Sequence, residues 1–163
     1  MCIDENLEQL LIEFLRRHSY ITDFRTQNIT YLAELIYIER TGGKKLTDVT
    51  YRPYQYGVYS KQIDYELIKL YKKDTVVKKN KRASNARMYR LNSVEYTTSE
   101  NIKKLAKLIL DLTKYKSDTE IKEWCKSTYL FKNTRYESEV DFSKYVDNVL
   151  NNSKVIEDWK ILL

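Results

Sequence analysis

The sequence has little of the chemistry that marks turns, disulfides and metal sites. Its 163 residues include one proline, three glycines, two cysteines and one histidine. The scarcity of proline and glycine predicts regular structure joined by short connections. Cys2 and Cys125 lack a CxxC spacing, and His18 alone could join them, which is too few ligands for a zinc site. We therefore expect two ordinary reduced thiols and no bound metal.

Motifs of catalysis are also missing. The sequence contains no P-loop, no dinucleotide-binding glycine motif, no HExxH and no GxSxG. His18 follows the first expected helix, where a positive charge favours the C-terminal end of the dipole, and this role is favoured over that of a general base. Acids such as Asp64 and Glu66 have no histidine or further acid at a spacing that completes a metal site. These absences predict a protein that is not an enzyme, with no catalytic residues and no cofactor.

Long apolar runs are absent as well. No stretch approaches the roughly 18 residues that a membrane span needs. The first residues, MCIDENLEQLL, are acidic where a signal peptide would be basic. A chain of this length is the size of one ordinary domain. We expect a single domain over residues 1–163, in the cytoplasm and without membrane contact.

Helical periodicity runs through most of the chain. Leu7, Leu10, Leu11 and Phe14 recur at i, i+3, i+4 and i+7, and this pattern predicts an amphipathic helix. The segments DTVVKK and ARMYRL are instead β-branched or aromatic and flank a polar tip, which predicts a β-hairpin. The expected helices are 4–17, 27–40, 60–73, a helix capped by Thr98 or Ser99, 118–129 and 142–163 with a break near 151–153; the expected strands are 74–79 and 86–91.

The order helix, helix, helix, hairpin is that of a winged helix-turn-helix. The fold class that we predict is therefore mainly α with a small β-hairpin, in which a winged-helix-like core is followed by C-terminal helices. The last helix, within residues 140–163, carries apolar side chains that require burial. The core and a second copy of the chain are both suitable surfaces for it, so a homodimer stays open.

The net charge of +6 is concentrated in one part of the chain. From Ser60 to Leu91 there are ten lysines and arginines and three acids, whereas the remainder has 19 basic and 20 acidic residues. Such a helix and hairpin would attract a phosphate backbone, although Asp64 and Glu66 would repel it. The same charge also suits an acidic protein partner or simple solubility. The candidate nucleic-acid contacts are Lys61, Gln62, Lys69, Lys72, Lys78, Lys79, Lys81, Arg82 and Arg87.

One short stretch concentrates tyrosines and turn residues. YRPYQYGVYSKQID, residues 51–64, holds four of the 15 tyrosines, the single proline and one of the three glycines. Pro53 keeps the residue before it out of a helix, Gly57 permits a turn and Ser60 can cap the next helix. The rings are either core packing or anchors for a protein partner, a role that suits tyrosine. The candidate partner contacts are Tyr51, Arg52, Tyr54, Tyr56, Gly57 and Tyr59.

Residues 28–135 resemble the Panacea domain, the antitoxin domain also found in SocA-type antitoxins. That family has a helix of the pattern LxKLLY, a short tGkpLt segment, an aromatic-rich YGPxs turn, and then a helix and a hairpin. The matching residues here are Leu32, Leu35, Ile36 and Tyr37, then Thr41, Gly42 and Leu46, then Tyr56, Gly57 and Ser60, and EIKEWCKSTYLFKN at 120–133 is similar to a later helix of the family. Val58 stands where the family usually has proline, and Glu34 where it often has lysine.

The resemblance implies a non-catalytic antitoxin that neutralises a cognate toxin by direct protein–protein contact, by occluding or trapping it. It brings no catalytic or cofactor-binding residues with it. The other function that the sequence leaves open is a winged-helix DNA-binding regulator of transcription, from a mobile element or a virus. In that case the helix over 60–73 would enter the major groove.

Overall fold

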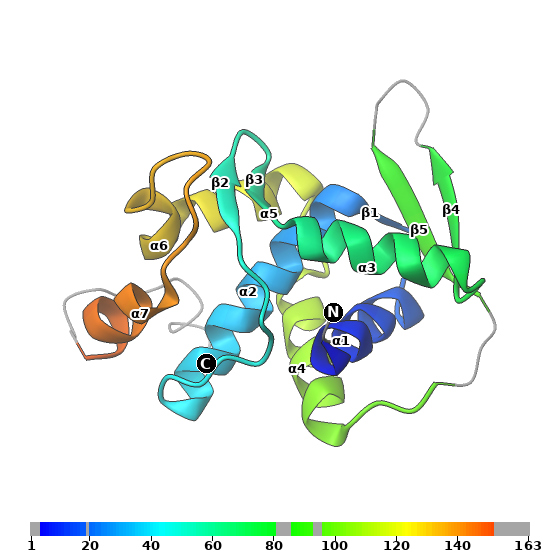
Figure 1. Ribbon diagram of the computed structural model, residues 1–163, viewed down its shortest axis with the longest axis horizontal. Coiled ribbons are helices and arrows are strands. Elements are labelled where there is room, and N and C mark those ends of the chain that lie inside the picture. The colour runs from blue at the N-terminus through cyan, green and yellow to red at the C-terminus, as the bar shows by residue number, and fades with distance from the viewer. Residues whose placement is uncertain (1–3, 19, 81–85, 93–95, 152–163) are drawn as a thin grey trace.

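The computed structural model describes residues 4–18, 20–80, 86–92 and 96–151 (Figure 1). Helix α2 runs through the middle of the molecule, with the β4–β5 hairpin at one end and the short helices α6 and α7 at the other (Figure 1). The elements are α1 Glu5–Arg16, β1 Ile21–Thr22, α2 Asp23–Thr41, β2 Arg52–Tyr54, β3 Gly57–Tyr59, α3 Lys61–Lys72, β4 Val76–Asn80, β5 Arg87–Leu91, α4 Glu100–Thr113, α5 Asp118–Ser127, α6 Tyr129–Lys132, α7 Phe142–Tyr145 and the π-helix η1 Val146–Leu150. In the part of the chain that is described, no helix is both long enough and apolar enough to cross a bilayer.

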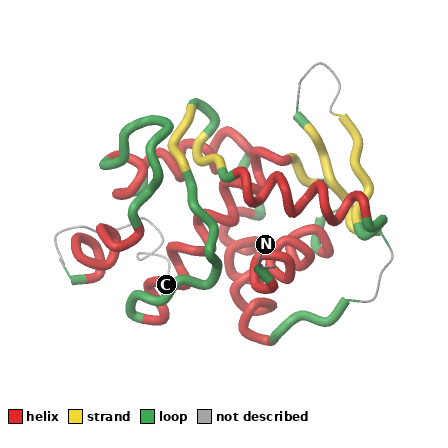
Figure 2. The backbone as a smooth tube through the Cα atoms, viewed as in Figure 1, coloured by secondary structure: helices red, strands yellow, loops and turns green. Residues whose placement is uncertain are grey.

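The prediction of a mainly helical chain with a small β-hairpin is confirmed. Strands β4 and β5 pair antiparallel where the hairpin is expected, and β1 pairs with β5, which gives the sheet order β1-β5-β4. Apart from β2 and β3, which lie between α2 and α3, the succession is α1, β1, α2, α3, β4, β5. With β1 paired to β5, this order gives the core a winged-helix-like connectivity. Strand β1 escaped prediction because two residues are too few to show alternation. Figure 2 shows the second sheet, β2 with β3, in a separate place beside the central helix.

Polar side chains fix the starts of the long helices. In each case the residue before the helix accepts a hydrogen bond from a backbone N–H of the first turn, which has no partner within the helix. Helix α2 therefore begins at Asp23, earlier than the predicted residue 27. It ends at Thr41, and the next residue, Gly42, caps it in the left-handed conformation, with a φ of 71°. The capping residues are Asp4, Thr22, Ser60, Ser99 and Ser117.

Helix α2 is buried around most of its circumference, because α1, α4, α5 and β3 all pack against it. The buried hydrophobic residues form one cluster that extends from α1 to η1. Since little of α2 faces water, the polar side chains that it carries have to find partners inside the protein. These buried polar residues are Asp23, Thr26, Gln27, Asn28, Thr30 and Glu34.

The C-terminal part differs from the prediction in two places. The expected helix over 118–129 is interrupted at Thr128, whose ψ of 151° is extended, so α5 ends at Ser127 and α6 follows as a separate turn. After α7 the chain passes into the π-helix η1 rather than into one long α-helix. The remainder of the expected helix over 142–163, from residue 152 onward, lies outside the described residues.

Two side chains have surroundings other than those expected. In the helix expected over 60–73, the apolar spacing of Ile63, Leu67, Leu70 and Tyr71 predicts that all four face inward. Tyr71 is instead 42% exposed, and the ammonium group of Lys78 lies 4.7 Å from the centre of its ring. His18 is half-buried, and burial followed by the charge of Arg25 lowers the pKa of its imidazole. The neutral imidazole is therefore favoured, in contrast to the positive charge expected at the end of the first helix.

Glu34 fastens the loop between α2 and β2 to the core. Its carboxylate accepts hydrogen bonds from the backbone N–H groups of Leu46 at 2.9 Å and Thr47 at 3.1 Å, and from the Thr47 hydroxyl at 2.8 Å. Burial raises the pKa of this carboxyl, while the hydrogen bonds act in the opposite direction. From α1, Nδ2 of Asn6 donates to the Leu46 carbonyl at 2.8 Å. The loop is therefore held from two helices, which sets where β2 begins.

We expect Glu34→Ala to lower the free energy of unfolding by about 2–4 kcal/mol, because two buried N–H groups lose their acceptor. Urea denaturation followed by circular dichroism measures the change. Glu123→Ala is the matched control, since the Glu123 side chain is 61% exposed, and it should change stability by less than about 0.5 kcal/mol. Equal losses in the two variants would contradict this role of Glu34.

Candidate functional site

Two neighbouring amides on α2 bind the backbone of the β2–β3 hairpin and of the residue that follows it. Oε1 of Gln27 accepts from the Ser60 N–H at 2.9 Å, and its Nε2 donates to the Ser60 carbonyl at 3.0 Å. Oδ1 of Asn28 accepts from the Val58 N–H at 3.0 Å, and its Nδ2 donates to the Tyr56 carbonyl at 3.1 Å. A carboxamide carries one acceptor and one donor group side by side, so each side chain pairs with backbone as a neighbouring strand would. The hairpin is thereby attached to α2 through its backbone.

Gly57 lies directly against the side chain of Asn28. Its φ is +109°, a conformation that residues with a side chain rarely adopt, and a Cβ atom built on it would overlap Oδ1 of Asn28. Gly42 is also left-handed, with a φ of +71°, but a Cβ atom there would meet nothing within 4 Å. Gly57, one of the predicted partner contacts, is buried and is required for the attachment of the hairpin.

Val58 supplies the N–H group that Asn28 binds. Proline has no N–H, so the residue that the Panacea family usually carries at this position could not form this hydrogen bond. Opposite Val58 in the hairpin stands Pro53, which also lacks an N–H. Asn28 therefore requires at position 58 a residue that has a backbone N–H, as valine does and proline does not.

An open pocket of about 200 Å³, which we call the tyrosine pocket, lies beside this attachment. The rings of Phe24 and Tyr56 pack with their centroids 4.9 Å apart. Tyr54 lies edge-on to Tyr56 and to Tyr59, 5.7 Å from each. Tyr56 is 45% exposed, whereas Tyr54 and Tyr59 are half-buried. The tyrosine pocket is lined by Asp23, Phe24, Gln27, Tyr54, Tyr56, Tyr59, Asp64 and Arg87.

Three charged side chains from different elements meet in the tyrosine pocket. Nε of Arg87 lies 3.5 Å from Oδ2 of Asp23, and its Nη2 lies 3.9 Å from Oδ2 of Asp64. Burial raises the pKa of the Asp23 carboxyl, against the opposite effects of the Phe24 N–H and of Arg87. The Tyr59 hydroxyl donates to Asp64 at 2.8 Å, and burial together with this bond raises the pKa of Tyr59 to about 12. Two carboxylates thus face one guanidinium group.

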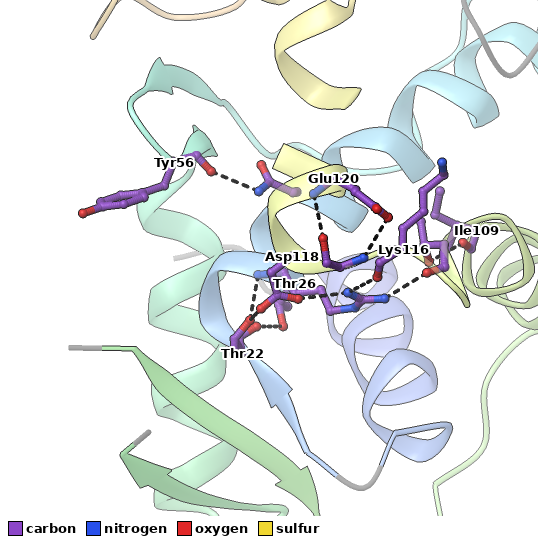
Figure 3. A network of polar contacts seen from close by, with 11 residues as sticks. Thr22, Thr26, Tyr56, Ile109, Lys116, Asp118 and Glu120 are labelled. Carbon is purple, nitrogen blue, oxygen red and sulfur yellow. Dashed lines mark hydrogen bonds and ion pairs between the residues drawn. The ribbon is translucent and has the colours of Figure 1, made fainter. Parts of the chain in front are cut away.

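A second pocket, of about 260 Å³, shares Phe24 and Tyr56 with the tyrosine pocket. It carries a different set of charges, one from Asp118 and one from Lys122, and its other lining is largely neutral. Figure 3 shows the Tyr56 ring pointing away from Asp118 and the polar network around it. The ring pair of Phe24 and Tyr56 therefore belongs to both hollows.

The Asp118 carboxylate forms part of a network that joins the core to the C-terminal helices (Figure 3). It accepts hydrogen bonds from Nη1 of Arg25 at 2.9 Å and from the Thr22 hydroxyl at 2.8 Å. Arg25 also donates to the carbonyls of Lys116 at 2.9 Å and Thr113 at 3.0 Å. These bonds tie the start of α2 to the connection between α4 and α5, and they hold one wall of the second pocket.

The structure brings some of the predicted partner contacts together and separates others. Three of them, Tyr54, Tyr56 and Tyr59, line the tyrosine pocket. Tyr51 is fully buried, with its ring edge-on to Tyr31 at 5.4 Å and to Phe142 at 6.0 Å, so it is a core residue rather than a surface contact. Arg52 is exposed, and its guanidinium lies 3.3 Å from the Glu139 carboxylate, away from the lining of the pocket.

The predicted nucleic-acid contacts lie in several different surroundings. Oε1 of Gln62 accepts a hydrogen bond from the Thr50 N–H at 2.7 Å, which occupies its amide with the preceding loop. Lys69 pairs with Glu66 at 3.2 Å and with Glu8 at 3.8 Å. Of the others, Lys61, Lys72 and Lys79 are exposed, Lys78 is half-buried, Arg87 lies in the tyrosine pocket, and Lys81 and Arg82 lie outside the described residues.

Four residues of α2 that build the site were not predicted: Asp23, Phe24, Gln27 and Asn28. Polar residues near the start of an expected helix are ordinary surface positions, so they attracted no functional interpretation. One signal was available in the sequence. The two adjacent amides precede Ile29 and Leu32 in a helix that is apolar on several sides, and amides in such a helix are buried and need partners.

No protein-family model, no curated protein and no solved structure matches this chain. Among the residues that the structure describes, no group of three or more histidines, cysteines, aspartates or glutamates is placed to hold a metal ion. Cys125 is buried, and burial raises the pKa of its thiol well above the ordinary value, which leaves it unreactive.

We expect Gly57→Ala to cost at least ~2 kcal/mol of stability, because it combines backbone strain with overlap on Asn28. Gly42→Ala, which adds strain without overlap, should cost about 1–2 kcal/mol. In an Asn28→Ala background the overlap disappears, so the cost of Gly57→Ala should fall by at least ~1 kcal/mol. Urea denaturation of the unmodified chain, the two single variants at Gly57 and Asn28 and the double variant gives a double-mutant cycle, with Gly42→Ala as the separate control. Strictly additive losses of stability at Gly57 and Asn28 would contradict the close contact.

Proposed function

We propose that this chain is a non-enzymatic, antitoxin-type binding protein that neutralises a cognate toxin by direct contact through the tyrosine pocket and the β2–β3 hairpin. The observation that carries the proposal is an aromatic surface held in place through the backbone. Gln27 and Asn28 bind the peptide groups of segment 56–60, and they leave the rings of Tyr54, Tyr56 and Tyr59 free to form a pocket. The toxin as partner comes from the resemblance of residues 28–135 to the Panacea domain.

The chemistry of the pocket suits recognition of a protein. Interfaces owe much of their binding energy to a few aromatic or arginine residues that are packed and desolvated at the centre of a polar rim. Tyrosine offers a large, rigid ring and a hydroxyl that stays hydrogen-bonded. Tyr56 supplies the exposed ring, while Tyr59 is already held by Asp64. A surface that is ordered before binding loses less entropy on association, which favours tight occlusion of a toxin.

The toxin itself is identified by two properties that an arbitrary contaminant would not share. It inhibits growth when it is produced alone, and co-production of this chain restores growth. Candidate toxins are the products of genes that lie next to the gene for this chain. Affinity purification of the tagged chain, with quantitative mass spectrometry, provides the measurement of binding.

We expect Tyr56→Ala to reduce capture of the toxin at least tenfold and to abolish the restoration of growth, because an exposed anchor ring is lost. Tyr115→Ala is the matched control, since Tyr115 is 88% exposed and lies outside both pockets. Tyr115→Ala should unfold at the same urea concentration as the unmodified chain, and Tyr56→Ala, which loses the ring contacts with Phe24 and Tyr54, should still be fully folded in the absence of urea. Equal capture by the unmodified chain and by Tyr56→Ala would contradict the proposed surface.

A second candidate function, DNA binding, is favoured by a different observation. Exposed cations lie along α3 and the β4–β5 hairpin of the winged-helix-like core. The Tyr20 ring lies 3.9 Å from the ammonium of Lys79 and 5.6 Å from the guanidinium of Arg90. Cation–π contacts with the ring hold these two cations close to each other, where both could contact phosphate. Against this function stand the occupied amide of Gln62 and the paired ammonium of Lys69.

If the chain binds DNA through this face, replacing Lys72, Lys79 and Arg90 together by alanine should lower the slope of log K against log salt by about 2.7, since each phosphate contact contributes about 0.9. Fluorescence anisotropy with a random-sequence duplex, at several salt concentrations, measures the slope. Lys103→Ala serves as the control, because Lys103 lies on α4 and pairs with Glu100. An unchanged slope in the triple variant would eliminate this face as the DNA contact.

A further inference from the structure

We propose that the tyrosine pocket takes the guanidinium group of an arginine side chain that the protein partner inserts between the rings and the two aspartates. This inference rests on the proposed function, since it names the kind of residue that a partner would present. Three features of the pocket carry it: its size, its charge and the arrangement of its rings.

The size of the pocket suits one side chain. Pockets for whole cofactors and drug-sized ligands commonly measure about 300–1,000 Å³. The tyrosine pocket measures about 200 Å³ and is open to solvent. A single long side chain that enters from a neighbouring surface fits these dimensions better than a nucleotide or a folded segment.

The charge of the pocket calls for a cation. Asp23 and Asp64 carry two negative charges, and Arg87 supplies one positive charge. The distances of 3.5 and 3.9 Å from Arg87 to these carboxylates are longer than direct hydrogen bonds. Asp23 accepts a direct hydrogen bond from the Phe24 N–H at 2.9 Å, and Asp64 accepts one from the Tyr59 hydroxyl at 2.8 Å. Because the two oxygens of a carboxylate can accept about four hydrogen bonds, both carboxylates keep acceptor capacity, and one added positive charge would make the pocket neutral.

The rings favour a guanidinium group over an ammonium group. Phe24, Tyr54, Tyr56 and Tyr59 line the same hollow, and their faces and edges offer flat apolar surface. Guanidinium is planar, stacks on aromatic rings and loses its weaker hydration at lower cost, whereas ammonium is a compact, strongly hydrated charge. The several N–H groups of a guanidinium can also reach two carboxylates that lie on different elements.

The second pocket provides an internal comparison. Its one carboxylate, Asp118, is already hydrogen-bonded to Arg25 at 2.9 Å, and Lys122 adds a positive charge to its lining. A cation gains little there, although the two pockets share the ring pair of Phe24 and Tyr56. The unmatched negative charge therefore distinguishes the tyrosine pocket from its neighbour.

The test uses the full-length chain and four small probes, with binding followed by the NMR signals of the tyrosine rings. Nα-acetyl-arginine amide stands in for an arginine within a partner protein. Nα-acetyl-citrulline amide has the same shape without the charge, and Nα-acetyl-lysine amide carries the charge without the plane. Free arginine tests for a small-molecule site. Because the arginine amide is small, it should bind with a dissociation constant of about 1 mM.

We expect the arginine amide to bind at least tenfold more tightly than the citrulline and lysine amides and no more weakly than free arginine, with shifts at Tyr54, Tyr56 and Tyr59. Asp64→Asn should weaken it about tenfold, because half of the negative charge is removed. Arg87→Met should instead tighten it several-fold, because the competing cation is removed. Asp111→Asn is the charge-matched control on α4, exposed and paired with Lys107, and should have no effect.

Equal binding of the arginine and citrulline amides, or of the arginine and lysine amides, would overturn the proposal. So would tighter binding of free arginine, which would make the pocket a small-molecule site. A general loss of structure would weaken binding in both variants, so it cannot explain weaker binding in Asp64→Asn together with tighter binding in Arg87→Met. Unchanged binding in both variants would also overturn the proposal. If the arginine amide fails to bind while Tyr56→Ala still loses the toxin, this inference alone fails. If the arginine amide binds but Tyr56→Ala retains the toxin, the proposed function fails.

Discussion

Helix α2 and the β2–β3 hairpin are in close contact through the side chains of Gln27 and Asn28. Asn28 approaches Gly57 so closely that no side chain fits there, and Gln27 pairs with both backbone groups of Ser60. Ser60 is in turn the N-cap of α3, so the amide of Gln27 sets where that helix begins. One pair of adjacent side chains therefore positions the hairpin, its tyrosines and the following helix together.

This contact also explains why α2 tolerates so many buried polar groups. A helix that is packed on most sides cannot offer them water, so each must be bonded to protein. Glu34 accepts hydrogen bonds from the backbone of the loop before β2, and Asn28 accepts one from the backbone of the β2–β3 hairpin. Arg25, at the start of the same helix, binds the connection between α4 and α5. These polar residues of α2 thus connect three neighbouring segments to the core, and the tyrosine pocket forms where the hairpin meets α2, α3 and β5.

Much of the fold could be predicted from the sequence, because periodicity and capping are local signals. Ser60 as a helix cap, and the β-branched and aromatic segments of the β4–β5 hairpin, show this well. The site could be predicted only in part. Tyr51 and Tyr56 are alike in sequence, yet one ring is buried by the distant Phe142 and the other is exposed. The tyrosine pocket is likewise assembled from α2, β2, β3, α3 and β5, and no local pattern reports such long-range meetings.

The β2–β3 hairpin is held rigidly on α2 through its own backbone. Native-state amide hydrogen exchange tests this attachment most directly, since the N–H groups of Val58 and Ser60 are the donors to Asn28 and Gln27. We expect both amides to exchange as slowly as those in the middle of α2, and far more slowly than the amide of Gln55 at the hairpin tip. Exchange of Val58 and Ser60 at the rate of Gln55 would contradict it.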